Sequence, residues 1–171
     1  MMEKNDSKTS LWRGRNTRLI VVRSDQNSGK TTTIGMVLEE LLADGATLRC
    51  CNNYWYGGHD IIPAALSGAI VGTDFYAELN WNEKFIIMNS AGDIKGDVQN
   101  MLKYALPQNP DYLICASRSQ NRKGSSWELF ETIYTNILYR RVCFWSEYSA
   151  YPKNKHIVKE PTVEAIIKYM K

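Results

Sequence analysis

The class of protein to which this sequence belongs is narrowed first by the features that the sequence lacks. Lys and Arg number 21 and Asp and Glu number 18, so the formal net charge is only +3. Such a small excess does not indicate nucleic acid as a partner. No apolar run approaches the roughly 20 residues of a membrane-spanning helix, and the N-terminus is polar where a secretory signal is apolar. We therefore expect no membrane association and a cytoplasmic location.

Cysteine is scarce as well. The four cysteines fall in apolar, strand-like segments and lack the paired spacing of metal ligands; they are Cys50, Cys51, Cys115 and Cys143. We interpret them as reduced thiols of the core, which again favours the cytoplasm.

What is present is the composition of one globular domain. Hydrophobic residues make up 44% of the chain and charged residues 23%, as in folded proteins rather than disordered ones. Residues 1–17 are mainly charged or small and polar, and they are predicted to form a flexible arm. Residues 18–171 are enough for a single domain with its own core.

Strands and helices alternate along this domain. The predicted strands cover residues 18–23, 46–51, 74–79, 84–89, 112–116 and 142–146, and the predicted helices cover 31–43 and stretches that begin near Ile94, Ser125 and Pro161. Strand, helix and strand in succession join parallel strands through right-handed crossovers. We therefore expect a three-layer α/β fold with a mostly parallel sheet of five to six strands, flanked by helices, with one antiparallel hairpin strand.

A phosphate-binding pattern lies between the first predicted strand and the first predicted helix. Ser24-x-x-x-x-Gly29-Lys30-Thr31 matches the Walker A pattern at every fixed position except the first, where serine replaces glycine. The chain thereby resembles the P-loop NTPase superfamily, from about Arg18 onward. The resemblance implies a P-loop NTPase-like fold that binds the phosphates of ATP or GTP with Mg²⁺.

The residue types of this loop suit that chemistry. Gly29 lets the backbone approach closely, Lys30 neutralises phosphate charge, and the hydroxyl of Thr31 can coordinate Mg²⁺. Backbone amides of the loop and of the helix start complete the predicted nucleotide-binding set, which comprises Asp25, Gln26, Asn27, Ser28, Gly29, Lys30, Thr31 and Thr32.

A second motif follows the predicted hairpin. Asn89-Ser90-Ala91-Gly92 resembles the D-x-x-G motif of GTPases and related switches, in which the aspartate holds Mg²⁺ through water and the glycine amide contacts the γ-phosphate. Here Asn89 stands in place of the aspartate. We therefore predict Asn89, Asp93 and Thr31 as the metal side of the site and Gly92 as a nucleotide contact. Asp93 could instead cap the helix that begins near Ile94.

Two further segments are expected at the carboxyl edge of the sheet. The loop Arg118–Gly124 resembles the arginine-bearing lid of small nucleotide kinases, and Arg118 is its best candidate for a catalytic contact beside Lys30 and Asp93. The segment Asn52–Asp60 contains aromatic rings that could stack a base or pack on the domain itself. No N-K-x-D motif follows residues 112–116, so guanine specificity is unsupported and ATP is weakly favoured.

Three functions remain open from the sequence. The hairpin and the Asn89–Gly92 motif favour an Mg-dependent NTP hydrolase or switch. The arginine loop favours a kinase that transfers the γ-phosphoryl group to a nucleotide or other small acceptor. The two departures, Ser24 and Asn89, favour a nucleotide-binding module with weak catalysis.

Overall fold

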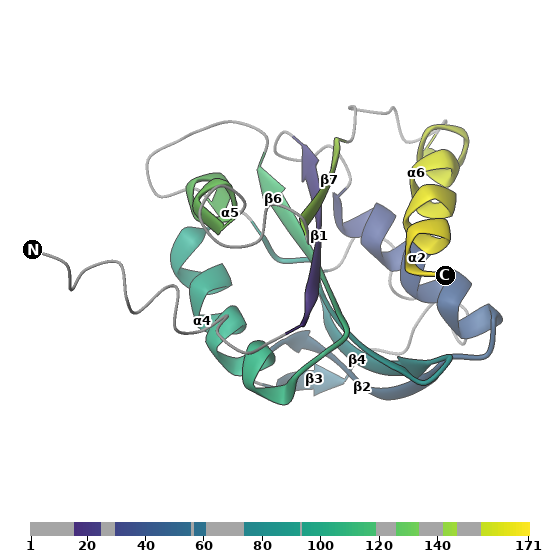
Figure 1. Cartoon of the computed structure of the whole chain (residues 1–171), viewed down its shortest axis with the longest axis horizontal. Coiled ribbons are helices and arrows are strands. Elements are labelled where there is room, and N and C mark those ends of the chain that lie inside the picture. Colours follow the sequence, from purple (N-terminus) through teal and green to yellow (C-terminus); the bar gives the residue numbers. More distant parts are fainter. Residues whose placement is uncertain are drawn as a thin grey trace, which may run out of the picture.

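The computed structural model shows a seven-stranded sheet with helices on both of its faces (Figure 1). It describes residues 16–24, 30–55, 57–60, 74–92, 94–118, 126–133, 142–146 and 155–171. The strands are β1 (Arg18–Ser24), β2 (Thr47–Tyr54), β3 (Gly57–Asp60), β4 (Tyr76–Trp81), β5 (Lys84–Asn89), β6 (Tyr112–Arg118) and β7 (Val142–Ser146). The helices are α2 (Lys30–Ala43), α4 (Lys95–Ala105), the short 3₁₀ helix η1 (Leu106–Gln108), α5 (Ser126–Ile133) and α6 (Lys155–Met170).

One half of the sheet is parallel. β5, β6, β1 and β7 are neighbours in that order, and each pairs in parallel with the next. Leu19, Ile20, Val21 and Val22 of β1 are fully buried, as expected for a strand with helices on both faces. The continuous apolar run that predicted this strand therefore reflects its central position.

The other half of the sheet is antiparallel, which contradicts the predicted fold class. The strand order is β3-β2-β4-β5-β6-β1-β7, and the β3–β2, β2–β4 and β4–β5 pairs are all antiparallel. The sheet is mixed and has seven strands. The prediction of a mostly parallel P-loop NTPase-like sheet of five to six strands, with one antiparallel hairpin strand, is therefore wrong.

The error arose at β2. The sequence-based prediction made this strand part of a parallel unit with β1, but β4, β5 and β6 lie between the two. Periodicity reports which residues are buried and says nothing about which strand lies next to which. β2 contains several polar residues, namely Thr47, Arg49, Asn52 and Asn53. They indicate a strand near the edge of a sheet, which is covered less completely than β1.

Local chemistry explains the antiparallel pairs. Asn82 and Glu83 form the β4–β5 turn with φ of 48° and 63°, the left-handed conformation of a tight hairpin turn, which asparagine adopts readily. In β2 the register shifts between Leu48 and Cys50. One extra residue at such a bulge bends the strand, and Arg49 there lies over the Phe85 ring at 4.6 Å.

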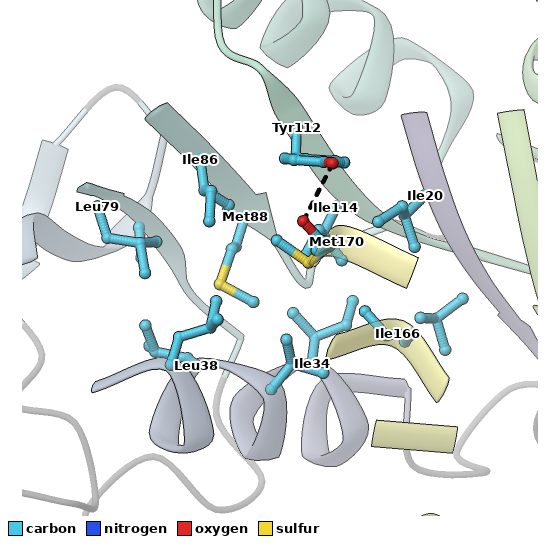
Figure 2. Packing of buried hydrophobic residues seen from close by; sticks show 14 of the residues in the cluster. Ile20, Ile34, Leu38, Leu79, Ile86, Met88, Tyr112, Ile114, Ile166 and Met170 are labelled. Carbon is cyan, nitrogen blue, oxygen red and sulfur yellow. Dashed lines mark hydrogen bonds between the residues drawn. The ribbon is translucent and has the colours of Figure 1, made fainter. Parts of the chain in front are cut away.

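The larger part of the core lies between the sheet and the helices α2 and α6 (Figures 1 and 2). Ile34 and Leu38 of α2 and Ile166 of α6 point toward the sheet, as their helical spacing predicts. The hydroxyl of Tyr112 donates a hydrogen bond of 3.2 Å to the carbonyl of Met170, which fixes the end of α6 on the sheet.

The opposite face of the sheet is covered by α4 and α5 (Figure 1). Val98, Met101 and Leu102 of α4 and Phe130 of α5 pack there against Ile87 and other buried residues of the sheet. None of the described helices is long and apolar enough to cross a membrane. Cys50, Cys51 and Cys115 are free thiols, of which Cys51 and Cys115 are buried in the core and Cys50 is half-buried.

Candidate functional site

Several chain segments meet at one edge of the sheet. Ser24 of β1 is paired with Arg118 of β6, and Asn89 of β5 is paired with Cys115, so three parallel strands end at this edge. β4 runs the opposite way and begins here, because Tyr76 is paired with Asn89. Asp74, which precedes β4, therefore lies at the carboxyl edge. Open α/β sheets bind ligands at this edge.

A hydroxyl and a carboxylate from distant segments meet at this edge. The Thr31 hydroxyl, in the first turn of α2, donates a hydrogen bond of 2.7 Å to Oδ1 of Asp74. The two residues are 43 positions apart in the sequence. Thr31 is half-buried, whereas Asp74 is exposed. The contact joins the start of α2 to the start of β4 at a place that solvent can reach.

Ser90 extends this contact into the sheet. Its hydroxyl accepts a hydrogen bond of 2.8 Å from the amide of Phe75 and donates one of 3.4 Å to Oδ1 of Asp74. Its own amide donates to the carbonyl of Phe75 at 3.0 Å. Ser90 is almost completely buried. The segment after β5 therefore positions Asp74 against Thr31.

The turn that follows Ser90 is tightly packed. The Asn89 side-chain amide donates a hydrogen bond of 2.6 Å to the carbonyl of Ala91. A Cβ atom on Gly92 would overlap the carbonyl oxygen of Ala116 in β6, so only glycine fits there. The hydroxyl of Ser126, the first residue of α5, donates to the carbonyl of Gly92 and also lies 3.3 Å from the Ser117 hydroxyl.

We call Thr31, Asp74, Ser90, Gly92 and Ser126 the edge cluster. It joins the starts of α2, β4 and α5 to the end of β5 through hydroxyl, carboxylate and carbonyl groups. These oxygen atoms are the kind of ligand that Mg²⁺ prefers, and Mg²⁺ commonly takes one or two protein ligands, with water and phosphate completing its shell. In the described part of the chain no three His, Cys, Asp or Glu residues form a metal-binding group. Of the edge cluster, the Thr31 hydroxyl and the Asp74 carboxylate are the groups that could hold a metal.

The structure brings together some of the predicted site residues. Thr31 and Gly92 belong to the edge cluster. The Asn89 side chain is hydrogen-bonded to Ala91 in the turn before Gly92. Thr32 is half-buried in the first turn of α2, where Lys30 is the first residue. The backbone of Arg118 ends β6 beside Ser24.

The remaining predictions fall outside the described residues. They concern Asp25, Gln26, Asn27, Ser28, Gly29 and Asp93, the side chains of Lys30 and Arg118, and the loop after Arg118. The assignments of these residues therefore stay predictions.

Sequence reasoning missed Asp74, Ser90 and Ser126. Asp74 was placed in a predicted strand, and nothing in its neighbourhood relates it to Thr31. Ser90 lies inside the Asn89–Gly92 motif, but the motif is defined by its first and last residues and predicts nothing for the hydroxyl of Ser90. Ser126 lies where a helix was predicted to begin, and no contact was predicted for its hydroxyl. The contacts of all three depend on which strands are neighbours.

Of the rings in the predicted aromatic segment, that of Trp55 packs against the domain itself. The ring centroids of Trp55 and of Tyr104 in α4 are 5.3 Å apart, and those of Tyr104 and Tyr76 are 5.9 Å apart. The Tyr76 hydroxyl donates a hydrogen bond of 2.7 Å to Glu78, beside Cys50, which is paired with Glu78. We call these five residues the aromatic corner.

Burial controls ionisation in the aromatic corner. It raises the pKa of Tyr76 far above its ordinary value, and the hydrogen bond to Glu78 and the negative charge of Glu78 add to this effect. Burial also raises the pKa of Cys50, again with a contribution from the charge of Glu78. Both groups are therefore neutral near pH 7, and Cys50 has little of the thiolate character that a nucleophile requires.

Comparisons with protein-family models, with curated proteins and with solved structures found no match for this chain.

Proposed function

We propose that this chain binds a nucleoside triphosphate with Mg²⁺ at the edge cluster and acts as an NTP hydrolase or switch, with ATP weakly favoured over GTP. The phosphates would lie against the Asp25–Thr32 segment, which runs from the end of β1 into α2. A helix start attracts phosphate oxygens because its amides and its dipole favour negative charge.

The contact between Thr31 and Asp74 is the observation that carries this proposal. A threonine that follows Gly-Lys can give its lone pairs to Mg²⁺ while its proton is donated to a carboxylate. The 2.7 Å hydrogen bond from Thr31 to Asp74 holds the hydroxyl in that state. The metal would supply charge neutralisation between the phosphates. Asp74 would bind it directly or through water, since Asn89 carries no charge with which to balance it.

Two predicted catalytic residues would act at the same place. Lys30 begins α2 immediately before Thr31, so its charge would neutralise the bound phosphates. Arg118 ends β6 opposite Ser24, and its guanidinium would stabilise the charge that develops on a transferring phosphoryl group. Asp93 stays the proposed residue for orienting the attacking water.

Phosphoryl transfer to a small acceptor is the alternative that the position of Arg118 favours. Arg118 is paired with Ser24 at the end of β1, and a lid that begins there would meet both phosphate and acceptor. A nucleotide-binding module without turnover is the third alternative. It is supported by Asn89, whose amide is engaged with Ala91.

Ligand-dependent stabilisation tests the phosphate site. Wild-type protein and Lys30→Ala would be heated with ATP, GTP and their diphosphates, with and without Mg²⁺. A ligand at 100 times its Kd adds about 2.7 kcal/mol of stability, so the wild type should show a clear rise in Tm. Lys30→Ala should lose this rise. Lys103→Ala, at an exposed position of α4, is the matched control, and an undiminished rise in Lys30→Ala would refute the assignment of the loop.

Phosphate release then separates the three functions. Release from Mg-ATP or Mg-GTP alone supports a hydrolase, and release that requires an added nucleoside monophosphate supports a kinase. Binding that persists without either reaction supports the module with weak catalysis.

A further inference from the structure

The hydroxyl groups of Thr31 and Ser90 meet Asp74 at the same carboxylate oxygen. Thr31 donates to Oδ1 of Asp74 at 2.7 Å, and Ser90 donates to the same atom at 3.4 Å. A carboxylate oxygen offers two lone-pair positions, so both positions of Oδ1 are in use. Oδ2 accepts no hydrogen bond from the residues that the structure describes. Asp74 therefore has one oxygen, Oδ2, with which to bind a cation.

The backbone at the start of β4 holds Ser90 in this position. The Ser90 hydroxyl accepts a hydrogen bond of 2.8 Å from the amide of Phe75, and the Ser90 amide donates to the carbonyl of Phe75 at 3.0 Å. Because the first of these bonds uses a lone pair of the hydroxyl, its proton is free for Oδ1 of Asp74. Ser90 is only 2% exposed, so water has little access to this proton.

The number of available carboxylate oxygens distinguishes Mg²⁺ from Ca²⁺. Mg²⁺ requires near-octahedral geometry at about 2.0–2.1 Å and keeps several waters, so a single oxygen from a carboxylate is sufficient. Ca²⁺ takes roughly six to eight oxygen ligands at about 2.3–2.6 Å, and one carboxylate can supply two of them. A carboxylate with one available oxygen therefore suits Mg²⁺ better than Ca²⁺.

We propose that Ser90 determines the metal preference of the edge cluster. Together with Thr31 it occupies Oδ1 of Asp74, prevents the carboxylate from binding a cation through both oxygens, and thereby disfavours Ca²⁺. This inference rests on the proposed function, because it concerns the metal that accompanies the nucleotide. Ser90 acts through Asp74 and is a positioning residue. Without its hydroxyl, Oδ1 regains one lone-pair position while the contact with Thr31 is kept, and Asp74 can bind through two oxygens.

The test compares nucleotide binding with the two metals. Calorimetric titration with a non-hydrolysable ATP analogue, in excess Mg²⁺ or excess Ca²⁺, gives a Kd for each metal. The wild type should bind more tightly with Mg²⁺. Ser90→Ala should lower the ratio of the Ca²⁺ Kd to the Mg²⁺ Kd roughly fivefold. A general loosening of the start of β4 would weaken binding with both metals alike, so the ratio separates positioning of Asp74 from a structural role.

Three further variants serve as controls. Ser126→Ala removes a buried hydroxyl of the edge cluster that is bonded to Gly92 and not to Asp74, so any loss of affinity should be equal for the two metals. Asp74→Asn should weaken binding with both metals and keep the wild-type ratio, because each loses one oxygen ligand. The double variant S90A/D74N should show the same ratio as Asp74→Asn, since an amide has only one oxygen. Circular dichroism of every variant establishes that it is folded.

The outcomes separate this inference from the proposed function. A wild type that binds the analogue with neither metal overturns both. Wild-type binding that is as tight with Ca²⁺ as with Mg²⁺ overturns the role of Ser90 alone, and so does a ratio that Ser90→Ala leaves unchanged. A ratio that the Ser90 substitution lowers in the Asp74→Asn background too would show that Ser90 does not act through Asp74. If Ser90→Ala does not fold, a changed ratio in Asp74→Asn contradicts binding through a single oxygen.

Discussion

The edge cluster and the aromatic corner both bury polar groups, but they do so in different ways. In the aromatic corner the Tyr76 hydroxyl is satisfied by Glu78, two residues away on the same strand. In the edge cluster the partners come from four segments, and Asp74 remains exposed. A polar group satisfied by its near neighbour stabilises the fold. Polar groups that converge from distant segments on an exposed carboxylate do not serve the fold in this way, and they are the groups at which we propose that nucleotide binds.

The largest effect should come from the turn at the base of the edge cluster. In Gly92→Ala the new methyl group would overlap the carbonyl of Ala116, which belongs to a buried strand and cannot move without disturbing the sheet. We expect a loss of about 3 kcal/mol in the free energy of unfolding, measured by urea denaturation.

Gly96→Ala is the matched control for this change. Gly96 lies in the first turn of α4, and a Cβ atom there would meet nothing within 4 Å. Alanine favours a helix over glycine by about 0.5–1 kcal/mol, so this variant should be slightly more stable. Equal destabilisation by the two variants would show that Gly92 is not held against Ala116.

The second prediction separates binding from stability. Asp74→Asn should weaken affinity for Mg-nucleotide about tenfold, because the proposed metal would lose a charged oxygen ligand. Without nucleotide it should change the free energy of unfolding by less than about 0.5 kcal/mol, since Asp74 is exposed. Calorimetric titration and urea denaturation measure the two effects.

The aromatic corner should behave in the opposite manner. Glu78→Ala leaves the buried Tyr76 hydroxyl without its acceptor and should cost about 1–3 kcal/mol of stability. Nucleotide affinity should not change. If Glu78→Ala weakens nucleotide binding while Asp74→Asn does not, the assignment of the two regions is reversed.

The last prediction concerns alkaline pH. The folded state raises the pKa of Tyr76 and, by burial, that of Cys115, so above the ordinary values of about 8.5 for cysteine and 10 for tyrosine only the unfolded chain releases these protons. Stability should therefore be complete below pH 8.5 and should fall as pH rises, by up to about 1.4 kcal/mol per pH unit for each group.

Tyr76→Phe and Cys115→Ala identify the two contributions to this slope. Each variant should show a shallower fall in the free energy of unfolding between pH 8.5 and 10.5, after correction for its own lower stability. A slope that neither variant changes would assign the alkaline loss to other groups.

Part of this protein could be predicted from residues that are close in the sequence. The strand at residues 18–23 and the helix at residues 31–43 were predicted to within a residue or two, because apolar periodicity and Gly45 define their limits locally. The hairpin around residues 80–83 was predicted as well, because its two strands and its turn are neighbours in the sequence. The placement of β2 was not, since pairing with β4 is decided by contacts between distant segments.

The sequence by itself determined the limits of β1 and α2 to within a residue or two and the position of a Gly-Lys-Thr segment at the start of α2, since these depend on spacing and on local backbone preference. It did not predict β3, and it placed the start of the last helix near Pro161, whereas α6 begins at Lys155. Only the tertiary structure decided that the sheet is mixed and that Asp74 lies 2.7 Å from Thr31. It also decided that Ser126 binds the Gly92 turn. The physical reason is that a strand's own residues favour burial without specifying a neighbour, so the partners across the sheet are selected by packing of the whole core.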